Sequence, residues 1–150
     1  MATHLLRLLS LACLIGLSMN AMAGGSANLQ MQVTVLGSCS FVTSGDIILD
    51  FGALSHGDRT RQTQVPITCS NGTEFNARLS DGLYPSGTQR QMMLRTGTAK
   101  LPYDITVSPS RGVSQGGQIN LQLSATVRES DYSNRPLGSY TDTVVLSVNP

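Results

Sequence analysis

Successive side chains of the C-terminal stretch Ser139–Asn149 are expected to point to opposite faces of an extended strand. One face carries Tyr140, Asp142, Val144, Leu146 and Val148, and the other carries Thr141, Thr143, Val145, Ser147 and Asn149. A period of two with many β-branched residues is typical of a β-strand that has one apolar face. We expect this strand to run to the end of the chain, so that no later segment returns to pair with it. An unpaired apolar strand edge favours pairing with another chain.

A second alternating run lies near the other end of the chain. Leu29, Met31, Val33 and Val35 share one face, whereas Gln30, Gln32 and Thr34 share the other. It follows the flexible lead Gly24-Gly25-Ser26-Ala27. The hypothesis is that the two alternating runs join different molecules. The alternative is that the N-terminal run is the ordinary first strand of a self-contained domain.

Residues 1–23 have the pattern of a secretory signal peptide. A short segment with Arg7 precedes the apolar run Leu8–Leu17, and Ala21-Met22-Ala23 is a small-x-small cleavage pattern. The apolar run is too short for a stable membrane span. Cleavage removes one basic and no acidic residue, so the mature chain carries nine of each sign. A chain with balanced and scattered charges is not expected to have the basic surface patch that binds nucleic acid.

The mature chain has two cysteines, Cys39 and Cys69. In an exported protein an isolated pair predicts one disulfide, and no other pairing exists within the chain. In the chain-entropy model, closing a loop of this length stabilises the fold by about 3–4 kcal/mol.

The segments between these landmarks read as short strands separated by turn residues, and no window shows a helical stripe. Ser55–Arg61 and Ser108–Gly117 are expected to be loops, and Asn71-Gly72 is the strongest hairpin signal. The expected strands are 47–52, 62–69, 75–79, 91–94, 101–107 and 119–127. This spacing predicts a single all-β sandwich domain.

The residues of the mature chain do not form a recognisable catalytic or metal-binding motif. His56 is the one histidine after residue 23, and it lies in a polar loop too close to Ser55 and Asp58 to read as a triad. With both cysteines oxidised, zinc would lack ligands, and the chain has neither a calcium loop nor a phosphate-binding loop. We therefore predict no enzyme, no cofactor and no metal. The carboxylates and scattered arginines are expected to be solvated surface or turn residues: Asp46, Asp50, Asp81, Asp104, Asp131, Asp142, Arg90, Arg95, Arg111, Arg128 and Arg135.

Four stretches, taken in order, resemble the spore coat protein U domain that is shared by subunits of archaic (Csu-type) chaperone–usher pili. They are Cys39 with Leu49-Asp50-Phe51-Gly52; Cys69 with Asn71-Gly72-Thr73, Phe75, Leu79 and Asp81-Gly82; Arg90 with Met92-Met93-Leu94 and Leu101-Pro102-Tyr103; and Gly138–Val144. Many relatives carry a Trp-Gly pair after the Leu-Pro-Tyr motif, where this chain has Ser108–Gly112 without a tryptophan.

The resemblance implies an incomplete immunoglobulin-like β-sandwich over residues 37–150, completed by a donor strand from a neighbouring subunit. Residues 24–36 would be the donor-strand extension, with Leu29, Met31, Val33 and Val35 inserting into the neighbour. Tyr140, Val144, Leu146 and Val148 would form the edge strand of the acceptor groove.

The partners implied by this resemblance are a periplasmic pilus chaperone, an outer-membrane usher and neighbouring pilus subunits in a head-to-tail polymer. The protein would be exported through the periplasm to the cell surface as part of an adhesive pilus. Two alternatives stay open: a secreted spore-coat or matrix-type protein that folds alone, and a secreted glycan-binding module.

Overall fold

The computed structural model describes residues 29–150, and the signal-peptide prediction for residues 1–23 lies outside the described residues. The chain divides into two compact units, Met1–Thr34 and Val35–Pro150. Residues 29–34 of the first unit form no helix or strand. Within the described residues, no helix is long and apolar enough to cross a membrane.

The second unit is built almost entirely of antiparallel strands, which confirms the all-β prediction. The elements are β1 Cys39–Phe41, β2 Arg59–Cys69, β3 Glu74–Leu79, β4 Arg90–Leu94, β5 Lys100–Ser108, β6 Arg111–Val113, β7 Gly117–Val127, α1 Glu129–Tyr132, β8 Tyr140–Thr141 and β9 Leu146–Asn149. One sheet has the order β1-β2-β7-β5-β4-β8, and a smaller sheet has the order β6-β3-β9.

The longest strand pair of the domain is β2 with β7. Val65 lies opposite Leu121 and Ile67 opposite Ile119, in a register that extends over the whole of β2. Val65, Ile67 and Leu121 are almost fully buried, whereas Gln64, which precedes Val65, and Gln122, which follows Leu121, are exposed. The period of two in the sequence therefore sorts these side chains into an apolar inner face and a polar outer face.

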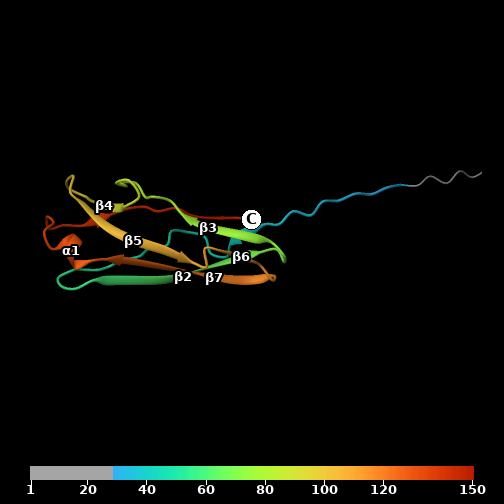
Figure 1. Cartoon of the computed structure of the whole chain (residues 1–150), viewed down its shortest axis with the longest axis horizontal. Helices are drawn as coiled ribbons and strands as arrows, with labels where there is room; N and C mark the ends of the chain where they lie inside the picture. Colours follow the sequence, from blue (N-terminus) through green and yellow to red (C-terminus); the bar gives the residue numbers. More distant parts are fainter. Residues whose placement is uncertain (1–28) are drawn as a thin grey trace, which may run out of the picture. The chain divides into compact units, whose positions relative to one another are not determined.

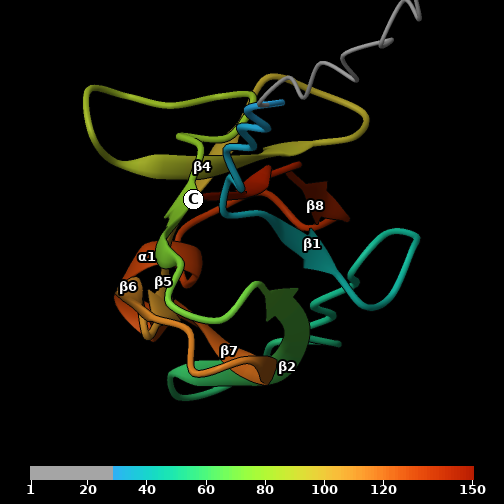
Figure 2. The ribbon, with the colours of Figure 1, turned by 90° about the vertical axis from the view of Figure 1, so that its right-hand side faces the viewer.

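Strand β5 connects the two ends of the larger sheet. Arg90 to Met93 of β4 pair with Lys100 to Tyr103, and the second half of β5, from Asp104 to Ser108, pairs with β7. Figure 1 shows β5 crossing diagonally from β4 to the layer of β2 and β7. Seen along the domain in Figure 2, β2 and β7 lie on the side opposite to β4, with β1 at the flank.

The turn at Asn71-Gly72 exists, but it does not make the predicted hairpin. Gly72 has a φ of 76°, and the Thr73 N–H bonds the Ser70 carbonyl at 3.1 Å. Yet β2 belongs to the larger sheet and β3 to the smaller one. Phe75 and Ala77 of β3 pack in the same apolar cluster as Ile67 of β2, so the two strands face each other across the core instead of pairing.

Four further expectations about elements were wrong. Residues 47–52 form no strand, and β2 starts at Arg59 inside the segment expected to be a loop. The predicted 108–117 loop contains β6, which pairs with β3. A single helical turn, α1, follows β7, although no window suggested a helix; four residues are too few for a helical stripe to show.

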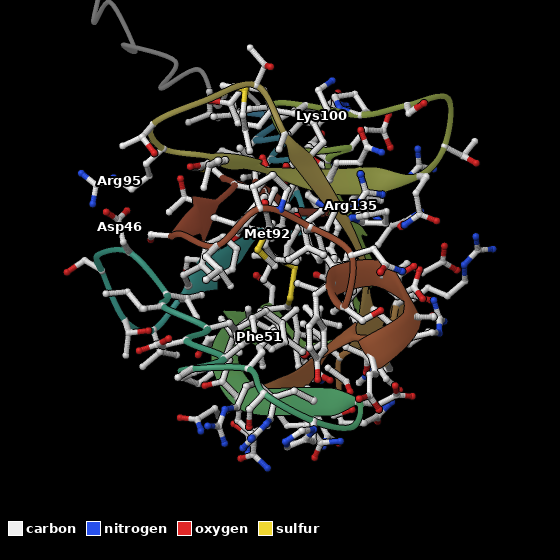
Figure 3. All side chains as sticks on the ribbon, turned by 90° about the vertical axis from the view of Figure 1, so that its left-hand side faces the viewer. Asp46, Phe51, Met92, Arg95, Lys100 and Arg135 are labelled. Atoms are coloured by element: carbon white, nitrogen blue, oxygen red, sulfur yellow. A yellow bond between two sulfur atoms is a disulfide. The ribbon has the colours of Figure 1, made fainter. Side chains whose placement is uncertain are left out.

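The buried residues form two separate apolar clusters. The first lies between β2, β7 and β3 and contains Ile67, Phe75 and Leu121. The second contains Met92, Leu101, Tyr103 and Val127, with Phe51 packed against it. Figure 3 shows Phe51 and Met92 among the strands, whereas Arg95 and Lys100 lie at the periphery.

Candidate functional site

A groove of about 820 Å³ opens where the two apolar clusters approach each other. Its floor is formed by Val65 and Leu123 from β2 and β7, and by Tyr103 and Ile105 from β5. Val65 and Leu123 belong to the first cluster, whereas Tyr103 and Ile105 belong to or contact the second. The domain thus has a gap in the middle of its core, at a place where a packed interior normally has almost no empty space.

One wall of the groove is the C-terminal segment, and here the predicted alternation is observed. Tyr140, Asp142, Val144, Leu146 and Val148 are half-buried, and the residues between them are exposed. The single strand expected over 139–149 is nevertheless broken. Its first part, β8, pairs with β4, and its last part, β9, pairs with β3. Residues 142–145 cross from one sheet to the other.

Two of the four residues predicted for the groove edge line the groove, and two do not. Val144 and Leu146 line it. Val148 packs against the first apolar cluster, and Tyr140 packs against the second while its hydroxyl donates to the Pro136 carbonyl at 2.8 Å.

The hydrogen bonds of β9 show that one of its edges is open. The Ser80 N–H donates to the Val145 carbonyl at 2.9 Å, and Arg78 lies opposite Ser147. Because bonding positions alternate in an antiparallel pair, the backbone groups of Val144, Leu146 and Val148 point away from β3. Among the described residues, β3 is the only strand that pairs with β9. The wall therefore presents a row of backbone donors and acceptors beside an apolar surface.

The opposite wall begins at β1 and continues through residues 42–49. The Val42 N–H donates to the Pro66 carbonyl at 3.0 Å, so the backbone groups of Phe41 point away from β2. Phe41, Val42 and Ile47 line the groove while remaining 42–51% exposed. Both walls thus combine an open backbone edge with apolar side chains that are only partly covered.

The disulfide predicted between Cys39 and Cys69 is present, and it anchors the wall that begins at β1. These residues lie opposite each other in the β1–β2 register, with Cα atoms 4.1 Å apart. Since β1 has only three residues and, within residues 29–150, pairs with β2 alone, the covalent bond is its main additional anchor.

One end of the groove is polar. Asp142 Oδ2 accepts from the Tyr103 hydroxyl at 2.6 Å, and Oδ1 accepts from the backbone N–H groups of Leu83 and Thr143, each at 2.8 Å. A Cβ atom on Gly82 would lie 2.2 Å from Asp142 Oδ2, so the close approach of this loop requires glycine. Burial, followed by the hydrogen bond to Asp142, raises the pKa of the Tyr103 hydroxyl well above its usual range. Tyr103 therefore remains a hydrogen-bond donor.

Next to this polar end of the groove, Ser80 and Arg90 hold the backbone at the end of β3 and at Val145. The Val145 N–H donates to Ser80 Oγ at 2.9 Å, where a regular ladder would use a carbonyl. Arg90 donates from Nε to the Ser80 carbonyl at 2.7 Å and from Nη2 to the Leu79 carbonyl at 3.1 Å. The sequence suggested a solvated Arg90 and Asp142; both instead hold the end of β3 and the crossing segment. In the sequence, the position of Asp142 on the apolar face of an alternating strand was the feature that could have indicated this structural role.

The four residues predicted for the donor strand are exposed. Leu29, Met31, Val33 and Val35 each expose between 84% and 88% of their surface. The apolar face of this alternating run is therefore uncovered in the structure, and its insertion into a neighbour stays a prediction. The first strand begins only at Cys39.

The described residues contain no group of three or more His, Cys, Asp or Glu side chains that could hold a metal ion. His56 is exposed in the loop before β2. What the groove offers is an elongated apolar surface with open backbone edges, and that is the chemistry of strand binding.

These features define a class of protein: an all-β sandwich with a partly open apolar groove between its two sheets. The profile of the Spore Coat Protein U domain matches residues 26–147, so the chain belongs to this family. A search of curated proteins found no match.

Among solved structures, the chain is similar to a chain of the CsuC–CsuE chaperone–tip adhesion subunit pre-assembly complex from archaic chaperone–usher Csu pili of Acinetobacter baumannii. The TM-score is 0.53 at 25% identity, over 77% of this chain. A weaker match, with a TM-score of 0.41 at 16% identity over 69% of this chain, is to a chain of a chaperone–tip adhesin complex of CFA/I fimbriae. The chain spans 40% and 38% of the lengths of these two solved chains.

Proposed function

We propose that this protein is a structural subunit of an adhesive surface pilus, in which each subunit completes the core of its neighbour with a donated strand. The observation that carries the proposal is the groove that divides the core between its two apolar clusters. The protein acts by assembly and not as an enzyme.

Filling the open groove with apolar side chains lowers the free energy of the complex. Each apolar side chain that moves from water into the groove contributes about 1.5–3 kcal/mol. An inserted strand also supplies partners for the outward backbone groups of Val144, Leu146 and Phe41. Main-chain hydrogen bonds then give affinity, and alternate side chains give specificity, as in other cases of strand addition.

The segment that fits this groove is the chain's own N-terminal run. Leu29, Met31, Val33 and Val35 alternate with polar residues and are exposed. We place the donor strand within residues 24–36, ahead of the sandwich domain at 37–150. Donation from one copy to the groove of the next is a head-to-tail contact that does not close, so it produces a filament.

Assembly of this kind needs a route and helpers. We propose that residues 1–23 direct export, that a periplasmic chaperone covers the groove before polymerisation, and that an outer-membrane usher exchanges the chaperone for the next subunit at the cell surface. The family membership and the similarity to a chain of a chaperone–subunit complex support these partners.

The test compares the thermal unfolding and the oligomeric state of two oxidised chains. One is Gly24–Pro150; the other lacks residues 24–35 and carries 28–35 after a flexible linker at Pro150, so that the donor folds back along β9. We expect the rearranged chain to be a monomer that unfolds at a much higher temperature, and the native order to form multimers.

The control changes the two faces of the appended strand separately. Replacing its Met31 and Val33 by Asn should abolish the gain, whereas replacing Gln30 and Gln32 by Ser should preserve it. A native chain that is already a stable monomer, and that gains nothing from rearrangement, would make the domain complete and favour a coat or matrix protein.

A further inference from the structure

Asp142 places a charged group on the C-terminal wall, at one end of the groove, whereas the other carboxylate that lines the groove, Asp46, belongs to the opposite wall. Going along the C-terminal wall, the inward side chains are Leu146, Val144 and then Asp142. No Lys, Arg or His of the described residues forms a salt bridge with Asp142. A carboxylate offers about four acceptor positions, of which three are used here, so one on Oδ2 remains.

This carboxylate discriminates between side chains that an inserted strand brings to it. An apolar side chain packed over Asp142 would remove water without replacing its hydrogen bond, and burying an ionised group in that way is strongly unfavourable. A position without a side chain, or one with a hydrogen-bond donor, avoids the penalty. The groove therefore accepts apolar groups beside Leu146 and Val144 but not beside Asp142.

The orientation of the inserted strand follows from the sheets themselves. Every strand pair in the domain is antiparallel, and antiparallel pairing is the more stable arrangement. Directly opposite residues in such a pair have side chains on the same face. The inward residues of the donor must therefore lie opposite Leu146, Val144 and Asp142, in reverse order of sequence.

We propose that Asp142, held by Tyr103, is a register stop for strand donation between two copies of this chain. In the register it imposes, Val33 of the donor copy lies opposite Leu146 of the acceptor copy. Val35 then lies opposite Val144, and Gly37, at which the donor copy's own sandwich begins and which packs against Thr73 of that copy, comes opposite Asp142 without a side chain. This inference rests on the proposed strand donation and names the specificity of that same groove.

Any other register either turns the apolar face of the donor away from the core or changes which donor residue lies opposite Asp142. A shift of one residue turns the apolar face of the donor away from the core. A shift of two residues puts Val35 over the carboxylate, and a shift of four puts Val33 there. A shift of two residues in the opposite direction would bring Cys39 opposite Asp142, but Cys39 belongs to β1 of the donor's own sandwich and is bonded to Cys69, so the strand cannot be inserted that far. The register that ends at Gly37 is therefore the one in which the donor's sandwich stays outside the groove and no apolar donor residue lies over Asp142.

Disulfide trapping between full-length mature chains measures the register. The acceptor copy carries Val144→Cys, and the donor copy carries one of Leu29→Cys, Met31→Cys, Val33→Cys or Val35→Cys. Opposite residues in an antiparallel pair lie about 5.5 Å apart, which a disulfide can span. Residues two positions away are displaced by about 7 Å along the strand, which is out of range.

Mixed chains are oxidised mildly and the linked peptides are identified by mass spectrometry, with the native Cys39–Cys69 bond verified in each. We expect the 35–144 link to exceed any other by about tenfold or more, because the competing registers bury the carboxylate. A dominant 29–144, 31–144 or 33–144 link overturns the register while leaving strand donation intact. Absence of every link overturns strand donation itself, and the stop with it.

A second arm tests whether Asp142 causes the register. In an acceptor copy with Asp142→Asn, the amide oxygen can still accept from the Leu83 and Thr143 N–H groups, but the charge is removed. The 33–144 link should then rise several-fold at the expense of the 35–144 link. Thr141→Asn, on the outward face of the same segment, is the matched control and should change nothing. If Asp142→Asn leaves the ratio of the 33–144 and 35–144 links unchanged, another feature sets the register, and the proposed role of Asp142 is wrong.

Discussion

Asp142 holds together three parts of the chain that are distant in sequence. Its carboxylate accepts from Tyr103 in β5, from Leu83 in the loop after β3 and from its own neighbour Thr143. Hydrogen bonds to a charged group contribute about 1.5–3 kcal/mol each. At the scale of single residues, this cluster sets the path of the segment that crosses between the two sheets.

The Tyr103 hydroxyl gives this cluster a measurable pH dependence. Its pKa is raised from an ordinary value of 10.0, so the folded protein binds this proton more tightly than the unfolded chain does. The resulting stabilisation is complete below about pH 10 and is lost as the pH rises further.

In urea unfolding, the free energy of the parent should therefore fall between about pH 10 and 12 more steeply than that of Tyr103→Phe. At pH 7 the same substitution should cost about 1–3 kcal/mol, because Asp142 loses a donor. Equal slopes above pH 10 in the two proteins would show that the hydroxyl is not bonded to the carboxylate in solution.

At the scale of elements, the walls of the groove differ in how they are anchored. The C-terminal wall is bonded to β4 through β8 and to β3 through β9. The other wall starts from β1, which has three residues and one partner strand. The disulfide compensates for this weak pairing by joining β1 to the end of β2.

Replacing both Cys39 and Cys69 by Ser should lower the free energy of unfolding by about 3–4 kcal/mol, since the cross-link no longer restricts the unfolded chain. The measurement is urea unfolding of whichever of the two chains, native or rearranged, is monomeric. Ser40→Ala, on the exposed face of β1, should stay within about 0.5 kcal/mol of the parent. A loss below about 1 kcal/mol would mean that β1 is held by its other contacts.

At the scale of the whole molecule, the joint between subunits should depend on apolar burial and backbone hydrogen bonds. Residues 24–150 carry equal numbers of basic and acidic side chains, and the proposed donor segment carries none. Salt weakens contacts between exposed charges, whereas it has little effect on buried apolar surface.

Multimers of Gly24–Pro150 should therefore persist when sodium chloride is raised from about 0.1 M to 1 M, where the screening length falls to about 3 Å. Guanidinium chloride, which solvates apolar and peptide groups, should dissociate them. Sedimentation velocity gives the size distribution in each case. Dissociation by salt alone would instead indicate ionic contacts between complete domains.

The local pattern of the sequence predicted which residues face inward, and it did so well. The alternation in β2, β7 and the C-terminal segment, the turn at Asn71-Gly72 and the Cys39–Cys69 bond all appear in the structure. Each of these depends on neighbouring residues or on there being only two cysteines after residue 23. The exposed run from Leu29 to Val35 was also visible as a pattern, although its insertion into another copy stays a prediction.

Only the tertiary structure decided which strands pair and where the core is left open. Asn71-Gly72 connects two sheets because Phe75 packs across the core from Ile67. Residues 47–52 form no strand, and Ile47 and Leu49 line the groove instead. The C-terminal strand breaks at Asp142 because Tyr103 and Leu83, both remote in sequence, supply its hydrogen bonds. A period of two specifies the face of a side chain, whereas pairing partners, and with them the groove, are set by packing between distant segments.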